Sequence, residues 1–127
     1  MWEDWQSDSI QMALDPKNDS LEDFNKDDIE IGLVLGKNQP VLYRTAPDLK
    51  ILAGEVSIQW TGTEILYEAA IPWHELGIEP PQPGKVMAIN FIVNDNDGQG
   101  RLYWMGLTPG IAEGKNPGVY RKWVFEK

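Results

Sequence analysis

Aromatic side chains are the residues of this sequence best suited to binding a ligand. The chain holds six tryptophans and four tyrosines in 127 residues. An aromatic ring can cover the apolar CH face of a sugar ring, while nearby amides, carboxylates and guanidinium groups hydrogen-bond the hydroxyls. Tyr43, Arg44 and Arg101 are amphipathic or polar candidates for such contacts. For the tryptophans inside apolar patterns, packing on a sheet face is the alternative to ligand binding.

Two turns rich in oxygen atoms are the second candidate for chemistry. Calcium takes six to eight oxygen ligands from carboxylates, carbonyls and amides. The candidate ligands are Asp15, Asn18 and Asp19 in one turn and Asp95, Asn96 and Asp97 in the other. Neither turn matches the EF-hand loop, because no glutamate stands at the required offset. The alternative is that these side chains hydrogen-bond the backbone of their own turns.

Catalytic patterns are weak in this chain. His74 is the single histidine and cysteine is absent, so the sequence has no zinc cluster, thiol nucleophile or disulfide. No serine–histidine–aspartate spacing is evident. Carboxylates are plentiful, but no motif places two of them on facing strands as a glycosidase requires. We therefore expect a protein that is not an enzyme.

The charge of the chain restricts its partners. The formal net charge is −9, and residues 1–30 hold ten of the twenty acidic residues against two lysines. Such a surface repels phosphate groups, which argues against nucleic acid and anionic membranes as partners. It favours a divalent cation or a neutral ligand, and the alternative is a solvated acidic rim that keeps the domain soluble. No run of about 18 apolar residues is long enough to span a membrane.

Apolar residues recur at every second position, which predicts β-strands. Expected strands lie at 9–14, 28–35, 41–44, 86–93, 102–105 and 119–125, with a hairpin over 55–71. Pro72 and Gly77 bracket one short helical turn. The pattern predicts a single all-β domain over 1–127, an antiparallel β-sandwich of the jelly-roll or immunoglobulin-like kind with about eight short strands.

Five segments resemble carbohydrate-binding modules of family 9 in order and spacing. The first is Trp5-Gln6-Ser7-Asp8-Ser9-Ile10-Gln11, followed by the acidic turn Asp15-Pro16-Lys17-Asn18-Asp19. Next come Tyr67-Glu68-Ala69-Ala70-Ile71-Pro72-Trp73 and Asn90-Phe91-Ile92-Val93-Asn94-Asp95, the latter with Arg101 and Trp104 behind it. Gly114-Lys115-Asn116-Pro117 resembles the loop before the family's last strand. Each match alone is weak, but their joint order covers nearly the whole chain.

The resemblance implies a sugar site that is only half preserved. Trp5 matches the first of two tryptophans that clamp a terminal sugar in the family, whereas the second falls near Ile111. The family's acidic ligand falls at Gln11, and its arginine and asparagine on the next strand fall at Gly32 and Val34. We expect stacking and hydroxyl hydrogen bonds from the following residues: Trp5, Gln11, Glu30, Arg101 and Trp104.

The resemblance also carries expectations about context. Family members have some tens of residues, including strands of both sheets, before the segment that matches Trp5. Without them a sandwich exposes strand edges, so we expect a homo-oligomer, built by strand exchange. The resemblance further implies an extracellular accessory domain of a glycoside hydrolase that binds an oligo- or polysaccharide. We expect that binding requires no cofactor. The resemblance suggests a structural calcium ion, for which the candidate ligands are Asp15, Asn18, Asp19, Asp95 and Asp97.

Two alternative functions stay open on the sequence alone. Related sandwiches bind haem b through methionine with histidine or lysine, and Met12, Met87, Met105 and His74 would supply such ligands. Methionine at alternating positions is more often core. The second alternative is a structural or oligomerisation module whose sugar site has decayed at Gly32, Val34 and Ile111.

Overall fold

β-Strands dominate the computed structural model, which describes residues 8–19, 21–96, 98–99 and 101–127. These ranges hold nine strands and two short 3-10 helices. The strands are β1 (Ser9–Asp15), β2 (Ile29–Leu35), β3 (Pro40–Ala46), β4 (Lys50–Ile51), β5 (Glu55–Trp60), β6 (Ile65–Ala70), β7 (Val86–Asn96), β8 (Arg101–Gly106) and β9 (Arg121–Val124). The 3-10 helices are η2 (Trp73–Leu76) and η3 (Pro117–Val119). The predicted all-β class is confirmed.

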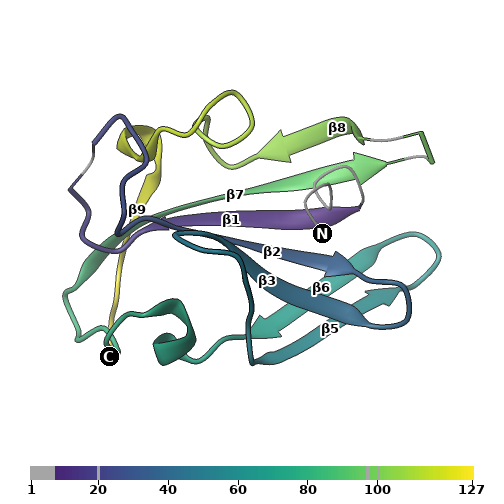
Figure 1. Cartoon of the computed structure of the whole chain (residues 1–127), viewed down its shortest axis with the longest axis horizontal. Coiled ribbons are helices and arrows are strands. Elements are labelled where there is room, and N and C mark those ends of the chain that lie inside the picture. Colours follow the sequence, from purple (N-terminus) through teal and green to yellow (C-terminus); the bar gives the residue numbers. More distant parts are fainter. Residues whose placement is uncertain (1–7, 20, 97, 100) are drawn as a thin grey trace.

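Seven of the strands form one antiparallel sheet. Its order is β4-β3-β2-β1-β7-β8, and β9 pairs with β7 beside the end of β8. The hairpin β5–β6 forms a separate two-stranded sheet. Figure 1 shows this hairpin on the side of β2 and β3, with β7 and β8 at the opposite side of the large sheet. Because β5 lies against β3, the second layer covers the β2–β3 half of the sandwich.

One face of the large sheet lies toward the hairpin, and we call it the inner face. It carries the apolar residues of the alternating pattern. Directly opposite residues of an antiparallel pair lie on the same face. Ile10 pairs with Val93, Met12 with Phe91 and Leu14 with Ile89. Residues of this face form the main buried cluster together with Leu52, which follows β4, and Leu76 on η2; the members on the strands are Leu14, Ile29, Ile31, Leu42 and Met87.

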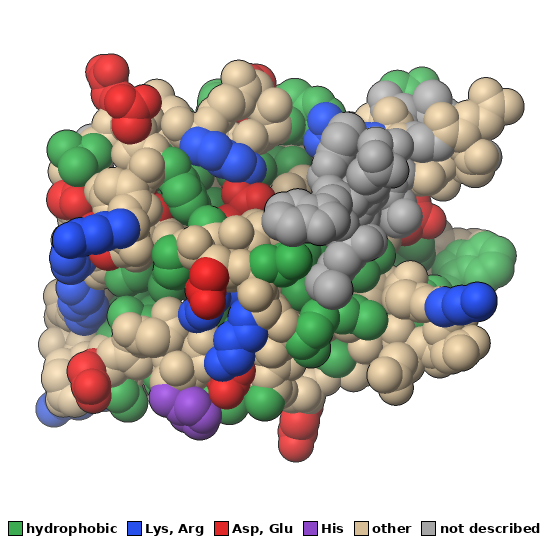
Figure 2. All heavy atoms as spheres, viewed as in Figure 1, with side chains coloured by type: hydrophobic (Ala, Val, Ile, Leu, Met, Phe, Trp, Pro, Cys, Tyr) green, Lys and Arg blue, Asp and Glu red, His purple; other side chains and the backbone are tan. Residues whose placement is uncertain are grey.

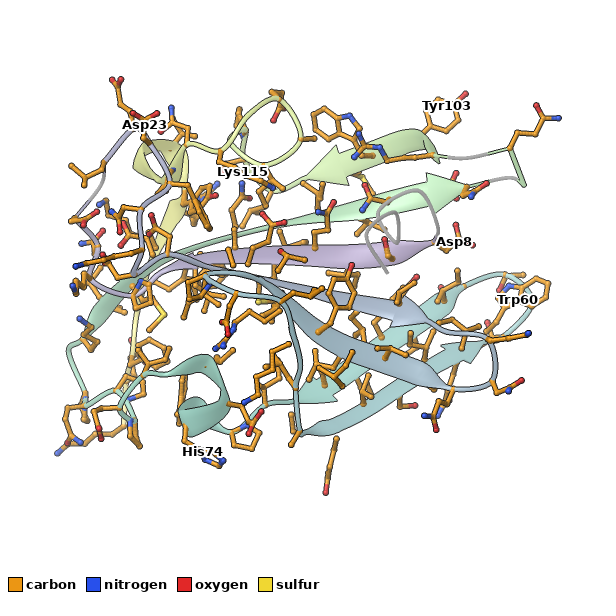
Figure 3. All side chains as sticks on the ribbon, in the orientation of Figure 1. Asp8, Asp23, Trp60, His74, Tyr103 and Lys115 are labelled. Atoms are coloured by element: carbon orange, nitrogen blue, oxygen red, sulfur yellow. The ribbon has the colours of Figure 1, made fainter. Side chains whose placement is uncertain are left out.

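One end of the sandwich is closed by aromatic side chains. Trp73 and Phe125 pack against the main cluster, and their ring centroids lie 5.7 Å apart in an edge-to-face arrangement. Trp73 therefore plugs this end, as its position after Pro72 indicates. At the opposite end, the side chain of Trp60 at the tip of the hairpin is 77% exposed, so it is not a core residue. Figure 3 shows it projecting beyond the strands.

The other face of the large sheet, the outer face, is partly covered by the loop between β8 and β9. Ile111 and Tyr120 from this loop pack with Ala13, Ala88 and Ile92 in a second buried cluster. The Tyr120 hydroxyl donates to the Gly110 carbonyl at 3.1 Å. The remaining part of the outer face, around the start of β1, holds polar residues.

Three features differ most from the sequence prediction. The short strand β4 was missed, because two residues cannot show an alternating pattern. The expected tight turn at 94–98 begins later, because β7 continues to Asn96 through a bulge opposite β8. The last strand starts at Arg121 rather than 119, because Pro117 begins the 3-10 helix η3 just before it. The Asn116 side chain accepts a hydrogen bond from the Gly118 backbone amide of this helix. No helix in the described ranges is long and apolar enough to cross a membrane.

Gly32 is required by the packing of Tyr43 on the outer face. The two residues are directly paired, and Tyr43 is buried. A Cβ atom at position 32 would lie 2.2 Å from the Tyr43 Cζ atom. Since the ring is enclosed, it cannot move aside at low cost.

We predict that Gly32→Ala lowers the free energy of unfolding by about 1–3 kcal/mol through overpacking. Denaturant titration measures the loss. Combining Gly32→Ala with Tyr43→Ala should make the glycine substitution nearly neutral, because the ring that it meets is gone. An equal cost of Gly32→Ala in both backgrounds would contradict this account.

Candidate functional site

A row of polar side chains crosses four strands on the outer face. The Asn94 side-chain amide donates to Gln11 Oε1 at 2.9 Å and to Ser9 Oγ at 3.2 Å. Arg101 Nη1 donates to Asn94 Oδ1 at 3.0 Å. Gln11 Nε2 donates to Glu30 Oε1 at 3.4 Å. We call this row of Arg101, Asn94, Gln11 and Glu30 the polar row.

Register explains why these residues meet. Gln11 stands opposite Gly32 on β2 and opposite Ile92 on β7, and Ser9 stands opposite Asn94. All of them therefore lie on the outer face, away from the apolar cluster. Asn94 is buried, and its amide can bridge its neighbours because it donates and accepts at once. The polar row is therefore a connected network.

The loop between β8 and β9 contributes a cation to the end of this network. Lys115 Nζ forms an ion pair with Glu30, whose side chain is only 9% exposed. Thr45 Oγ1 also donates to Glu30 Oε1, at 3.2 Å. Figure 3 shows Lys115 on the loop beside β7 and β1, and on the face seen in Figure 2 basic side chains lie beside acidic ones. Burial of Glu30 is thus matched by a positive charge.

An indole stands next to the polar row. Trp104 on β8 pairs with Asn94 and therefore lies on the outer face, with 40% of its side chain exposed. Gln11 and Arg101 are partly exposed. The face thus offers an amide, a guanidinium and a half-exposed aromatic ring within one region. Such a set can hydrogen-bond neutral hydroxyls and cover a CH surface.

Four of the five predicted sugar-binding residues lie in this region: Gln11, Glu30, Arg101 and Trp104. Trp5 lies outside the described residues. At position 32 the ring of Tyr43 occupies the space beside the backbone. Val34 and Ile111 are buried. These three positions therefore offer no polar group to a ligand.

Asn94 and Lys115 are not among the predicted sugar-binding residues, and neither are Ser9 and Thr45, which hydrogen-bond to the same network. In the sequence, Asn94 belongs to one of the family-like segments and Lys115 to another. The sequence signal for Asn94 is a polar residue that directly follows the apolar run Phe91-Ile92-Val93 and lies on the same face as Ile92. Lys115 carries no such signal, because the pairing of a loop residue with β2 is a tertiary contact.

A cluster of carboxylates lies at the other end of β1. Asp15, Asp19 and Asp27 each place one carboxylate oxygen within 4.8 Å of the others. Asp15 is fully buried at the end of the strand. Asp27 comes from the segment before β2, which folds back on the turn after β1. The sequence analysis missed Asp27, because it is eight or more residues from its partners.

Asp28 adds an unusual carboxylate next to this cluster. Its side chain is 0% exposed; Oδ2 accepts from the Asn25 amide at 2.7 Å, while Oδ1 has no hydrogen-bond partner. Burial raises the pKa of Asp28 to about 6, and the charges of Asp15, Asp27 and Asp19 add to the rise while the Asn25 hydrogen bond opposes it. Asp27 Oδ2 is likewise buried without a partner. These oxygens suit a hard cation.

The other predicted metal ligands have different surroundings. The Asn18 side-chain oxygen accepts from Lys122, and its backbone takes a left-handed conformation at φ 54°. Asp95 is exposed on β7 opposite Tyr103, at the far end of the sheet from Asp15. Asp97 lies outside the described residues. Metal binding by Asp95 and Asp97 therefore stays a prediction, because only part of that turn lies within the described residues.

The proposed haem ligands do not gather either. Met87 is in the main core cluster and Met12 packs against it. Met105 is 72% exposed on β8, while His74 has an 80% exposed side chain on η2 and projects outward (Figure 3). Nothing in the described part of the chain brings a histidine and a methionine together.

Comparisons with known proteins agree on one family. The model described as "Carbohydrate family 9 binding domain-like" matches residues 2–120. Two solved structures are similar, both of a carbohydrate binding module family 9 from Caldicellulosiruptor kristjanssonii. The complex with glucose has a TM-score of 0.74 and 21% identity, covering 94% of this chain and 59% of that chain. The complex with cellotriose has a TM-score of 0.75 and 20% identity, covering 97% of this chain and 60% of that chain.

No curated protein matches this chain. The chain spans about three fifths of the length of the two solved structures. At this level of identity the structural likeness establishes the fold, and the predicted sandwich is confirmed by it.

Asn90 fixes the loop that carries Lys115, and this yields a prediction. Its side chain donates to the Thr108 and Pro109 carbonyls at 2.8 and 2.9 Å and accepts from the Thr108 amide at 3.0 Å.

We predict that Asn90→Ala lowers the free energy of unfolding by about 2–4 kcal/mol, because several buried backbone groups lose their partner. Chemical denaturation measures it. Asn116→Ala, which removes one exposed hydrogen bond of the same loop, is the control and should cost under about 1 kcal/mol. Equal losses would contradict the anchoring role of Asn90.

Proposed function

We propose that this chain, which belongs to the carbohydrate family 9 binding domain-like family, binds an oligo- or polysaccharide through the outer face of its large sheet. The binding is non-catalytic. The ligand is a plant- or microbial-type glycan, held by stacking on Trp104 and Trp5 and by hydrogen bonds from the polar row.

The observation that carries the proposal is the position of the polar row. Gln11 and Arg101 are partly exposed, and each is held by the same buried amide of Asn94. Trp104 lies beside them with its indole half exposed. Hydrogen-bonding groups that are pre-positioned next to an aromatic face are what a neutral sugar ring requires.

The geometry favours a small footprint. The Tyr43 ring next to Gly32 and the burial of Val34 and Ile111 remove contacts that the family resemblance suggested. The binding surface is therefore concentrated around β1, β7 and β8. One or two sugar rings are the expected ligand unit, with modest affinity since little area is buried. The two similar solved modules were captured with glucose and cellotriose, which supports β-glucan-type ligands as the first to test.

We also propose that calcium stabilises the turn end of the sandwich. The candidate ligands are the clustered oxygens of Asp15, Asp19 and Asp27, with Asp28 beside them. A cation there would offset the repulsion among carboxylates that lie within 4.8 Å of one another. Its role would be structural, because the polar row lies toward the other end of β1.

Several expectations about context stay predictions. An extracellular location and attachment to a glycoside hydrolase follow from the resemblance and await tests on the protein in its source. The homo-oligomer expected from exposed strand edges is likewise untested. The structural or oligomerisation module without a sugar site is the competing function.

The sugar-binding proposal predicts a loss of retention when Trp104, Trp5 or the polar-row residue Gln11 is replaced. Trp104→Ala or Gln11→Ala should weaken binding to a responsive polysaccharide by about tenfold or more, since each removes a direct contact worth about 1–2 kcal/mol. Trp5→Ala should have the same effect with little change in melting temperature. Affinity electrophoresis across cellulose, xylan, mannan, pectin and alginate finds the ligand, and calorimetry with its oligosaccharides gives the affinity.

Two residues of the hairpin provide matched controls. Trp60 and Gln59 are exposed on β5, away from the outer face. Trp60→Ala and Gln59→Ala should leave retention unchanged. If the hairpin variants abolish retention and the Trp104, Gln11 and Trp5 variants do not, the assigned face is wrong. If no polysaccharide in the panel retains the wild-type chain, the module without a sugar site becomes the better explanation.

The calcium proposal predicts a rise in thermal stability on adding the ion. At a concentration 100 times its dissociation constant, calcium should add about 2.7 kcal/mol to the free energy of unfolding. Asp19→Asn should weaken or remove this stabilisation. Asp23→Asn, an exposed acid in the same segment, should keep it. Calorimetric melting with calcium and with chelator checks the prediction, and an equal response of both variants would contradict the assigned ligands.

A further inference from the structure

Trp60 is the most exposed large apolar side chain among the described residues. A single exposed aliphatic residue is ordinary, but an indole has a large apolar surface that is costly to leave in water. The backbone beside it is fixed, because the Thr61 amide donates to the Glu64 carbonyl at 2.9 Å and closes the hairpin turn. An aromatic ring held at the surface in this way is suited to cover a ligand.

A pocket lies beside this indole, at the end of the sandwich where β1 begins and β5 ends. Its volume is about 520 Å³, within the range of about 300–1,000 Å³ that is usual for small-molecule sites. Ile58 pairs directly with Tyr67, and Trp60 pairs with Ile65, so both rings lie on the face of the hairpin toward the large sheet. The walls of the pocket include residues of both sheets: Ile58, Trp60, Tyr67, Leu35, Asp8 and Asn96.

Asp8 is the one charged residue among the described residues of this lining. Its Oδ1 accepts from the Asn96 backbone amide at 2.8 Å, which ties the carboxylate to the end of β7. Figure 3 shows Asp8 and Trp60 at the same end of the molecule. Burial raises the pKa of the Tyr67 hydroxyl, and the charges of Asp8 and Asp95 add to the rise. The pocket therefore combines aromatic rings with a negative potential.

This combination selects an organic cation. A cation is attracted to the face of an aromatic ring, and a carboxylate beside the rings pairs with it. The charge of −9 on the whole chain also attracts cations to the surface. A hard metal ion fits less well, because it takes about six to eight oxygen ligands and the described lining holds a single carboxylate.

We propose that this pocket binds the protonated amine of an amino sugar, with the sugar ring on the Trp60 indole and the ammonium group paired with Asp8. The CH face of a pyranose covers an indole, and the Tyr67 hydroxyl stays protonated and can donate to a sugar hydroxyl. A lysine side chain of a protein partner has the same charge, but its narrow chain would leave most of the pocket empty.

The pocket is separate from the polar row. It opens between the two sheets, whereas Gln11 and Trp104 lie on the outer face of the large sheet. The amino-sugar site therefore does not depend on whether the outer face binds a polysaccharide. Trp104→Ala should keep amine binding even where it loses polysaccharide retention.

The test compares two trisaccharides that differ at the amine, the trisaccharide of glucosamine and its fully N-acetylated counterpart. Calorimetry on the wild-type chain at slightly acidic pH and low salt should show that the amine form binds about tenfold tighter or more, because the ion pair and the cation–π contact add to stacking. This preference should shrink as salt is added. In NMR spectra, the indole N–H resonance of Trp60 should shift with the amine form, and that of Trp104 should not.

Variants of the pocket divide the interaction into its two parts. Trp60→Ala should weaken binding of the glucosamine trisaccharide by about fivefold or more. Asp8→Asn should remove the preference over the acetylated form, while the amide oxygen at that position still accepts from Asn96. Trp123→Ala, which removes another exposed indole, and Glu55→Gln, which removes an exposed charge at the other end of β5, are the controls and should leave both affinities unchanged. Calorimetric melting checks that each variant is folded.

Three results would overturn the proposal. One is equal affinity of the wild-type chain for the two trisaccharides, or no binding of either. Another is loss of amine binding in Trp104→Ala with full binding in Trp60→Ala, which would place the amine on the outer face. The third is a lysine-rich peptide that shifts the Trp60 resonance at lower concentration than the glucosamine trisaccharide, which would assign the pocket to a protein partner.

Discussion

The alternation of β1 between two faces is the constraint on which the rest of the structure depends. β1 lies in the middle of the large sheet and pairs with both β2 and β7. Its even-numbered positions Ile10, Met12 and Leu14 build the inner face, while Ser9 and Gln11 carry the outer face. A slip of one residue would exchange the two sets and place the polar side chains of Ser9 and Gln11 on the apolar inner face. The apolar packing of the inner face therefore also aims the polar row outward.

Strands and their faces could be predicted from the sequence because they depend on local alternation. The inward sets of β1, β2 and β6 follow directly from the apolar residues, and the outward positions of Gln11 and Glu30 follow with them. The edge strand β4 and the length of β7 could not be predicted in this way. The first is too short to show a period, and the second depends on its pairing with β8 beyond the apolar run.

The candidate site could be predicted only in part, because much of it consists of contacts between distant residues. Asn94 holds Gln11 across 83 positions of sequence, and Lys115 reaches Glu30 from a loop that has no pattern of its own. Asp27 joins Asp15 because the segment after β1 folds back. The same dependence explains Trp60: its alternation indicated packing, but the layer that would bury it does not extend over the tip of the hairpin.

The anchoring of the loop between β8 and β9 affects the entropy cost of binding a sugar. Asn90 and the Lys115–Glu30 ion pair tie the start and the middle of this loop to the sheet, and Tyr120 near its end packs on the sheet. The entropy of ordering the loop is therefore lost during folding, not at the moment of association. A sugar would meet a preorganised surface, and its affinity would depend on the contacts that it makes and on the water that it displaces.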